Sequence, residues 1–117
     1  MILLNPAVAA SEAVAVNQSR PATATLLDSP DLRLVTFRLL PGQTVPLHTS
    51  TSSVLLTVLR GEGMILGRDT QRAVVAGDTI AYEPNEPHGM QATTAEFHLL
   101  ACITPRPGNR APSRALD

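Results

Sequence analysis

The sequence has no lysine, no tryptophan, only three aromatic residues and a single cysteine. All nine basic residues are arginine, and because ten acidic residues oppose them the formal net charge is −1. A near-neutral chain with so few aromatic rings has neither the basic surplus nor the base-stacking surface of a dedicated nucleic-acid-binding protein. One cysteine excludes an internal disulfide, which suits a reducing compartment.

The chain also lacks any apolar run of the roughly eighteen residues that a membrane span requires. Its Ala/Val-rich start, residues 1–16, has no basic n-region, and Asn5, Pro6 and Glu12 interrupt the apolar stretch. We therefore interpret this start as part of the mature protein rather than as a signal peptide. A cytoplasmic protein with no membrane or nucleic-acid partner is expected.

The sequence does contain enough hydrophobic residues to form the core of one domain. Its 117 residues are 44% hydrophobic and only 16% charged, which supplies a core. We expect an N-terminal arm and first strand over residues 1–30, a barrel over 31–103 and a Pro/Arg-rich tail over 104–117. Within the arm, 22–27 is predicted to be a strand, and 12–16 either a strand or a helical turn.

Between residues 31 and 103 the apolar runs are short, and turn signals recur between them. No segment in this range has the 3.6-residue periodicity of an amphipathic helix. Short strands at such spacing predict an all-β sandwich or barrel. The expected strands are 32–40, 54–59, 64–66, 73–75, 79–82, 88–92 and 96–103. Turns are expected at 41–42, 61–63, 67–70, 76–78 and 83–87.

Two blocks of the sequence carry a recognisable motif spacing. In the first, Gly42 is followed by His48 after five residues, and Gly61 closes the block. In the second, Gly77-Asp78 precedes an apolar strand, a Pro-containing turn and His88. Two motifs in this order, each with correct internal spacing, are more specific than either alone.

These blocks resemble the two motifs of the cupin superfamily, in its small single-domain, RmlC-like form. The motifs cover residues 41–90, and the flanking strands extend the likeness to about 30–104. The resemblance implies a double-stranded β-helix, or jelly-roll barrel, with a ligand pocket inside it and frequent homodimers. It does not imply one reaction, because cupins include dioxygenases, isomerases, decarboxylases and proteins that only bind.

The resemblance also implies four metal-ligand positions, which in this sequence hold His48, Ser50, Val54 and His88. The first three share a strand parity, so we expect them to face the barrel interior together. A serine hydroxyl is a weak neutral ligand and valine is none, whereas stable zinc or iron sites use three or four good ligands. We expect His48 and His88 to hold a divalent metal (nickel, zinc or iron) weakly, or to bind none. The alternative is a structural pair of imidazoles bonded to each other, to water or to Ser50.

Three further residues are candidates to replace the missing ligands. In a simple hairpin of 88–92 and 96–103, His98 would face away from the side of His88, but a connection that crosses between sheets leaves its direction open. Glu83 and Glu86 belong to a predicted turn and are expected to point to solvent.

The expected pocket is mostly apolar, with a few convergent polar groups. Its predicted lining residues are His48, Ser50, Val54, Leu56, Tyr82, His88 and Met90. The candidate catalytic residues are His48 or His88 as a base and Tyr82 as a proton donor, although such a tyrosine is also an ordinary core or rim residue. Arg38 and Arg60 are expected to be solvated strand ends or clamps for a substrate carboxylate.

Three functions stay open at this point. The first is a cupin that binds a small molecule, with a degenerate two-His metal site or none. The second is an enzyme, either metal-dependent or a metal-free isomerase or lyase, and the third is a sensor or interaction module with a separate partner. A homodimer is expected in each case, with residues 7–16 as an arm at its interface, because a small sandwich leaves edge strands and sheet surface to cover.

Overall fold

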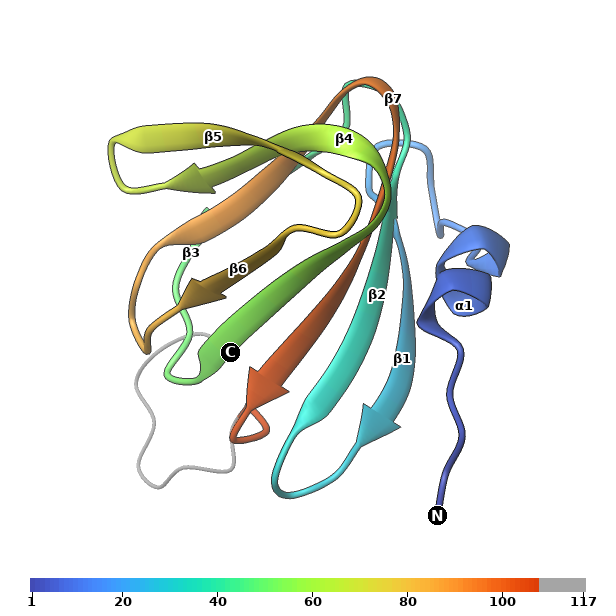
Figure 1. Ribbon diagram of the computed structural model, residues 1–117, viewed down its shortest axis with the longest axis vertical. Helices are drawn as coiled ribbons and strands as arrows, with labels where there is room; N and C mark the ends of the chain where they lie inside the picture. The colour runs from blue at the N-terminus through green and yellow to red at the C-terminus, as the bar shows by residue number, and fades with distance from the viewer. Residues whose placement is uncertain (108–117) are drawn as a thin grey trace.

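The computed structural model describes residues 1–107 and consists of one short helix and seven strands (Figure 1). All strand pairs in it are antiparallel. The elements are α1 (Pro6–Glu12), β1 (Ala22–Asp28), β2 (Arg33–Leu39), β3 (Thr44–His48), β4 (Ser53–Gly67), β5 (Thr70–Val75), β6 (Thr79–Tyr82) and β7 (His88–Thr104). The prediction of an all-β jelly roll is confirmed.

The two long strands, β4 and β7, pair with each other and run through both layers of the fold. The first part of β4 lies between the last part of β7 and β6, and β2 and β1 continue this layer beyond β7. The second part of β4 lies between the first part of β7 and β5, and β3 completes this layer. Both long strands therefore pass from one layer to the other, which closes the sheet around a core (Figure 1).

This crossing contradicts the turn predicted at residues 61–63. β4 continues through these residues, and its register with β7 shifts on either side of Gly61. Gly61 has φ +79, and a Cβ there would collide with the backbone oxygen of Glu96. At Gly63 a Cβ would lie 2.6 Å from the Phe97 ring. The glycines thus serve a bulge and a close strand approach instead of a chain reversal.

The strands predicted at 88–92 and 96–103 are likewise parts of one strand, β7, which crosses between the layers. The other turns, at 67–70, 76–78 and 83–87, lie where they were predicted. The strand predicted at 22–27 corresponds to β1.

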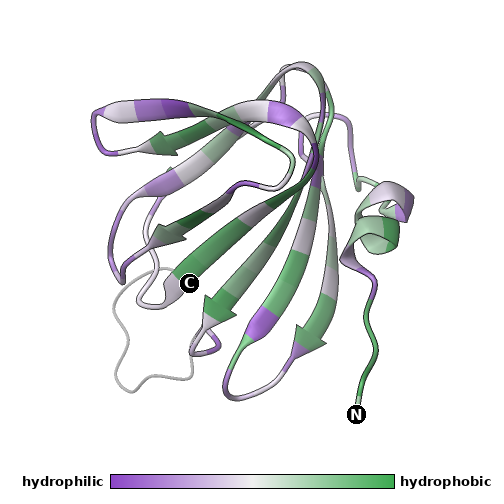
Figure 2. Ribbon diagram, viewed as in Figure 1, coloured by the Kyte–Doolittle hydropathy of each residue, from purple (hydrophilic) through white to green (hydrophobic). Residues whose placement is uncertain are grey.

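The core lies between the layers and is built from inward residues of β2, β4 and β7. Leu39, Phe97 and Leu99 are fully buried there, and Leu56 and Val58 are nearly so. Figure 2 shows hydrophobic stretches on the adjoining parts of β2, β4, β6 and β7, whereas β5 is more hydrophilic. Burial of apolar area stabilises a fold by about 25 cal/mol per Å², so this core is the main stabilising contribution.

Helix α1 was not predicted as such, although its start has a clear signal. Pro6 occupies the first turn, and the Asn5 side chain accepts a hydrogen bond from the Val8 amide at 3.2 Å. The helix packs on β1, β2 and β7, where Ala10 is fully buried. Within the described part of the chain, no helix has the length and apolar composition to cross a membrane.

Candidate functional site

Two histidines from different motifs meet at one end of the jelly roll. His48 ends β3, His88 begins β7, and the two residues are direct partners in the strand register. Their ring centroids are 4.2 Å apart, with the rings edge to face at 61°. His88 is buried at 6% exposure, whereas His48 is exposed. The fold therefore produces a pair of adjacent imidazoles, one inside and one at the solvent boundary.

Backbone carbonyls set the tautomer of both rings. His48 Nδ1 lies 2.9 Å from the carbonyl oxygen of Pro46, and His88 Nδ1 lies 3.0 Å from that of Glu86. A carbonyl oxygen only accepts, so we assign the proton of each neutral ring to Nδ1. Each Nε2 is left as an acceptor with no partner among residues 1–107. The same arrangement orients histidines at many ligand sites.

Burial and charge keep His88 neutral. Burial lowers its pKa below the usual 6.5, and the neighbouring His48 lowers it further, while the Glu86 carbonyl and carboxylate oppose the shift. His88 is therefore an uncharged hydrogen-bond acceptor at neutral pH, and equally a free base.

The imidazole pair opens on a cavity of about 100 Å³. This is well below the volume of about 300–1,000 Å³ that is typical of pockets for drug-sized ligands, so the cavity admits a very small molecule or one end of a larger one. Six of the seven predicted pocket residues line it. The described lining residues are Arg33, Phe37, His48, Ser50, Val54, Leu56, His88, Met90, Ala101, Ile103 and Pro107.

Ser50 and Val54 reach this cavity by a different route from the one expected. β3 ends at His48, and Ser50 lies in the loop before β4, so the parity argument along one strand does not apply. The loop nevertheless turns Ser50 inward, to 6% exposure, and its hydroxyl accepts a hydrogen bond from the Ser52 amide at 3.0 Å. Val54 is 3% exposed on β4 and adds an apolar wall.

Tyr82 lies beside the site, outside the set of residues that line the cavity. Its ring centroid is 5.2 Å from that of His88, but its hydroxyl donates to the Leu66 carbonyl at 2.8 Å. Burial, with a smaller effect of the Glu86 carboxylate, raises its pKa to about 12. Tyr82 instead lines a separate cleft of about 560 Å³ between β5 and β6.

His98 lies on the opposite face of β7. Its neighbours Phe97 and Leu99 point into the core, while His98 Nε2 lies 3.0 Å from a carboxylate oxygen of Glu96. Arg38 binds the same carboxylate at 2.8 Å and also donates to the Ala13 carbonyl after α1. Together these contacts hold the pKa of Glu96 down at about 2.

Arg38 thus fastens the N-terminal segment through the Ala13 carbonyl, and neither His98 nor Arg38 lines the cavity. Arg60 is exposed and does not line it either. The Glu86 carboxylate accepts a hydrogen bond from the Glu83 amide within the same turn, at 2.9 Å. Neither side chain lines the cavity.

The residues present do not fit the metal site that the motif pattern implies. Within residues 1–107 no group of three or more His, Cys, Asp or Glu is placed to hold a metal ion. Two imidazole nitrogens are available, but the described cavity wall contains no carboxylate and does contain the guanidinium of Arg33. A fixed positive charge beside only two neutral ligands disfavours a divalent cation.

Sequence reasoning missed five of the lining residues: Arg33, Phe37, Ala101, Ile103 and Pro107. Arg33 had a usable signal, as a charged residue at the start of the apolar stretch 32–40. It lies directly opposite Ile103 in the register of β2 and β7, so both side chains face inward. The predicted tail, 104–117, is described only as far as residue 107.

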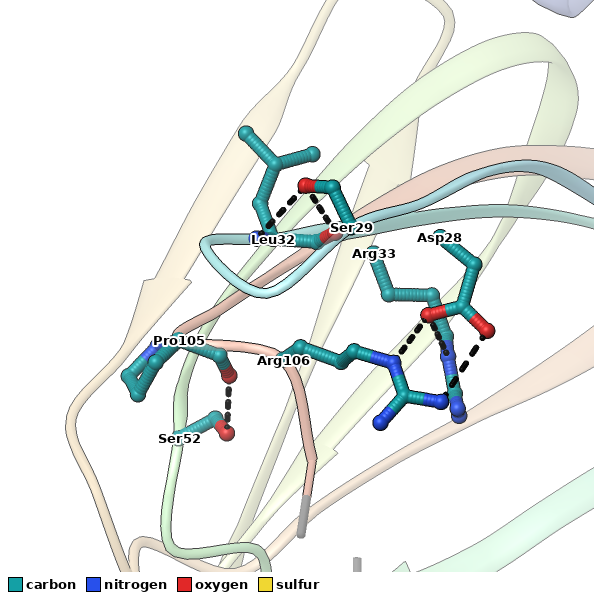
Figure 3. Close-up of polar contacts among 7 residues, drawn as sticks. All are labelled: Asp28, Ser29, Leu32, Arg33, Ser52, Pro105 and Arg106. Atoms are coloured by element: carbon teal, nitrogen blue, oxygen red, sulfur yellow. Dashed lines mark hydrogen bonds and ion pairs between the residues drawn. The ribbon is translucent and has the colours of Figure 1, made fainter. Parts of the chain in front are cut away.

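We call residues 104–107 the strap, and of these residues Pro107 lines the cavity. Figure 3 shows two of its attachments: Ser52 donates to the Pro105 carbonyl at 2.6 Å, and Arg106 forms an ion pair with Asp28. Thr104 also donates to the Asp31 carbonyl at 3.1 Å. These contacts place Pro107 as a buried part of the cavity wall.

Solved structures with the same fold are numerous. An RmlC-like cupin from Desulfovibrio desulfuricans is 28% identical, with TM-score 0.72, over 80% of this chain and 91% of that one. A Klebsiella pneumoniae protein with a double-stranded β-helix domain is 23% identical, with TM-score 0.76, over 83% and 87%. KdgF from a Halomonas species is 18% identical, with TM-score 0.73, over 81% and 86%. At such identities the last two show the fold alone.

Comparison with curated proteins finds no significant match. The cupin domain family, in contrast, matches residues 35–103, which is more than half of the chain and includes both histidines of the cavity. The motif spacing, the jelly roll and this match agree, and the chain belongs to the cupin family.

Proposed function

We propose that this cupin binds a small organic molecule in the cavity beside His48 and His88, without a tightly held metal ion. The observation that carries the proposal is the pair of cavity-lining imidazoles whose Nδ1 atoms are occupied by backbone carbonyls. Two oriented acceptors in an otherwise mostly apolar cavity are the pattern of a small-molecule site. They call for a ligand that carries a hydroxyl or amide donor.

The cavity volume limits the ligand and its affinity. A cavity of about 100 Å³ is too small to enclose a drug-sized molecule, so only one end of such a molecule would enter it. Very small ligands gain at most about 1.5 kcal/mol per non-hydrogen atom, so we expect dissociation constants in the micromolar to millimolar range.

The test is a titration of ¹⁵N-labelled protein with L-lactate, lactamide and propane-1,2-diol, followed by NMR. At least one probe should shift the amide signals of His48, His88 and Met90. The Ala101→Val variant adds two methyl groups to the wall without touching a polar group, and it should weaken binding about tenfold or more. Ala95→Val, at an exposed position of β7, is the matched control.

If Ala101→Val does not fold, Val54→Ile fills the same cavity from β4. Equal binding by the filled and control variants contradicts the proposal, and so does the absence of any shift with all three probes.

A second candidate is a metal-free isomerase or lyase that uses His88 as its base. The lowered pKa of His88 favours it, because the free base is the form present at neutral pH. In deuterated solvent, such an enzyme would exchange a carbon-bound hydrogen of its ligand, whereas a binding protein would leave it unchanged.

A homodimer is part of the same proposal, and the N-terminal segment supports it. Some of its side chains pack on the protein's own sheet, but several large apolar ones remain exposed. These are Met1, Ile2, Leu3, Val8, Val14 and Val16. The cytoplasmic location expected from the sequence stays a prediction.

A further inference from the structure

The wall of the cavity carries one fixed charge, and that charge is positive. Of the described residues that line it, Arg33 alone is ionised over the whole physiological range, and no carboxylate is present. The side chain of Arg33 is 29% exposed, so its guanidinium lies at the solvent side of the cavity. An anionic group is favoured there and a cationic one is opposed.

Arg33 has an acidic neighbour, but that neighbour is mainly engaged by another residue. Asp28 receives hydrogen bonds from Arg106 on both of its carboxylate oxygens, Nε to Oδ1 and Nη2 to Oδ2. Arg33 reaches the same Oδ1 only through Nε, at 3.5 Å (Figure 3). Two guanidinium groups thus share one carboxylate.

The terminal nitrogens of Arg33, Nη1 and Nη2, are the donors that could bind a ligand. Among the hydrogen bonds within residues 1–107, the Arg33 side chain donates only from Nε, to Asp28, and its Nη1 and Nη2 donate none. A guanidinium presents a planar fork of donors, which matches the two oxygens of a carboxylate. An ordinary surface arginine is simply solvated. Arg33 differs because it also faces the inner side of β2, opposite Ile103.

We infer that the ligand of the cavity is a small carboxylate with a hydroxyl or amide donor, and that Arg33 is its anchor. This inference rests on the proposed binding function, which it makes specific. The carboxylate lies against Arg33 at the solvent side, and the donor group turns toward Nε2 of His48 or His88. A short hydroxy acid or its amide analogue has both groups within a few bonds, which suits a cavity of about 100 Å³.

The strap affects the surroundings of Arg33, but we do not propose that it binds the ligand. By binding Asp28, Arg106 draws the counter-charge away from Arg33, and Pro107 covers the cavity beside it. Arg106 is therefore a positioning residue. In the absence of Arg106, Asp28 would be free to pair more closely with Arg33.

The deciding experiment compares L-lactate with lactamide, which differ in the charge of one group and little in size. NMR titrations at low salt use wild-type protein and the variants Arg33→Gln and Arg72→Gln. Arg72 is an exposed arginine of β5 that does not line this cavity. We expect wild type and Arg72→Gln to bind lactate about tenfold more tightly than lactamide, as for one charge-assisted contact at a partly exposed site.

In Arg33→Gln the affinity for lactate should fall by more than the affinity for lactamide, so that this preference disappears. If that variant does not fold, Arg33→Lys keeps the charge but not the fork, and the preference should fall several-fold. Equal binding of lactate and lactamide by wild type, or a preference that survives Arg33→Gln, overturns the carboxylate inference and leaves the binding function in place. Failure of every probe in wild type would remove both.

Discussion

At the residue scale, the site is shaped by what stands beside the two imidazoles. Ser50 and Val54 occupy positions that face the cavity, but they offer a hydroxyl already bound to the Ser52 amide and an apolar side chain. Burying a carboxylate at 3% exposure, where Val54 stands, would cost several kcal/mol unless a cation neutralised it. An apolar wall avoids this cost and leaves His48 and His88 as hydrogen-bonding groups.

This reasoning predicts that a metal site can be restored. The variant Ser50→His with Val54→Glu would add an imidazole and a carboxylate beside His48 and His88. We expect it to hold about one zinc per chain after dialysis and to melt at a higher temperature with zinc than without. Wild type should retain well below one metal per chain by mass spectrometry, after incubation with zinc, nickel or iron(II).

The same measurement of metal content can contradict this prediction. One metal per wild-type chain, lost in both His48→Ala and His88→Ala, would mean that two imidazoles suffice and that the argument from Arg33 and Val54 fails.

At the element scale, the two long strands determine where the site forms. Because β4 and β7 both pass between layers, the first residues of β7 meet β3 while its last residues meet β2. His88 and Ile103 therefore come from one strand yet line the same cavity. The bulge at Gly61 is the local feature that lets β4 make this passage.

Gly61→Ala should therefore destabilise the protein far more than alanine at another glycine with positive φ. Its Cβ would meet the Glu96 carbonyl on β7, whereas Gly42, at φ +82, has no atom within 4 Å of the added carbon. We expect Gly42→Ala to cost about 1–2 kcal/mol, from the left-handed conformation alone. Gly61→Ala should cost several kcal/mol or prevent folding, because backbone must move. Urea unfolding followed by circular dichroism measures both, and equal costs would contradict the close approach.

At the scale of the whole molecule, arginine side chains fasten the residues after α1 and the strap to the jelly roll. Arg38 holds the residues after α1 through Glu96 and the Ala13 carbonyl, and Arg106 holds the strap through Asp28. These contacts leave the extended start of the chain, with Met1, Ile2 and Leu3, uncovered. We expect these exposed apolar side chains to form an interaction surface.

We expect light scattering to give twice the chain mass of 12.4 kDa. The double variant Leu3→Ser with Val14→Ser removes two exposed apolar side chains of the N-terminal segment, and it should shift the equilibrium toward monomer. Leu47→Ser, exposed on β3 and outside that segment, is the control. A wild-type monomer at high micromolar concentration would contradict the prediction.

The cupin fold and the histidine pair were predictable because they depend on local patterns. Turn residues mark most strand ends, and the spacing of Gly42, His48, Gly77 and His88 identifies the two motifs. The bulge at Gly61 was not predictable, because a glycine between apolar runs has the same local pattern in a turn and in a bulge. The direction of His98 followed only from the register of β7 with β2 and β4.

The sequence by itself determined the fold family and the two imidazoles, since both depend on residue type and spacing, and the resemblance to cupins implied the loss of two of the four ligand positions. Only the tertiary structure decided the size of the cavity, the inward face of Arg33 and the sharing of Asp28 between two arginines. These features depend on contacts between residues as far apart as Asp28 and Arg106, and no local pattern specifies them. They arise because strand pairing across the crossing layers brings distant segments to one end of the molecule.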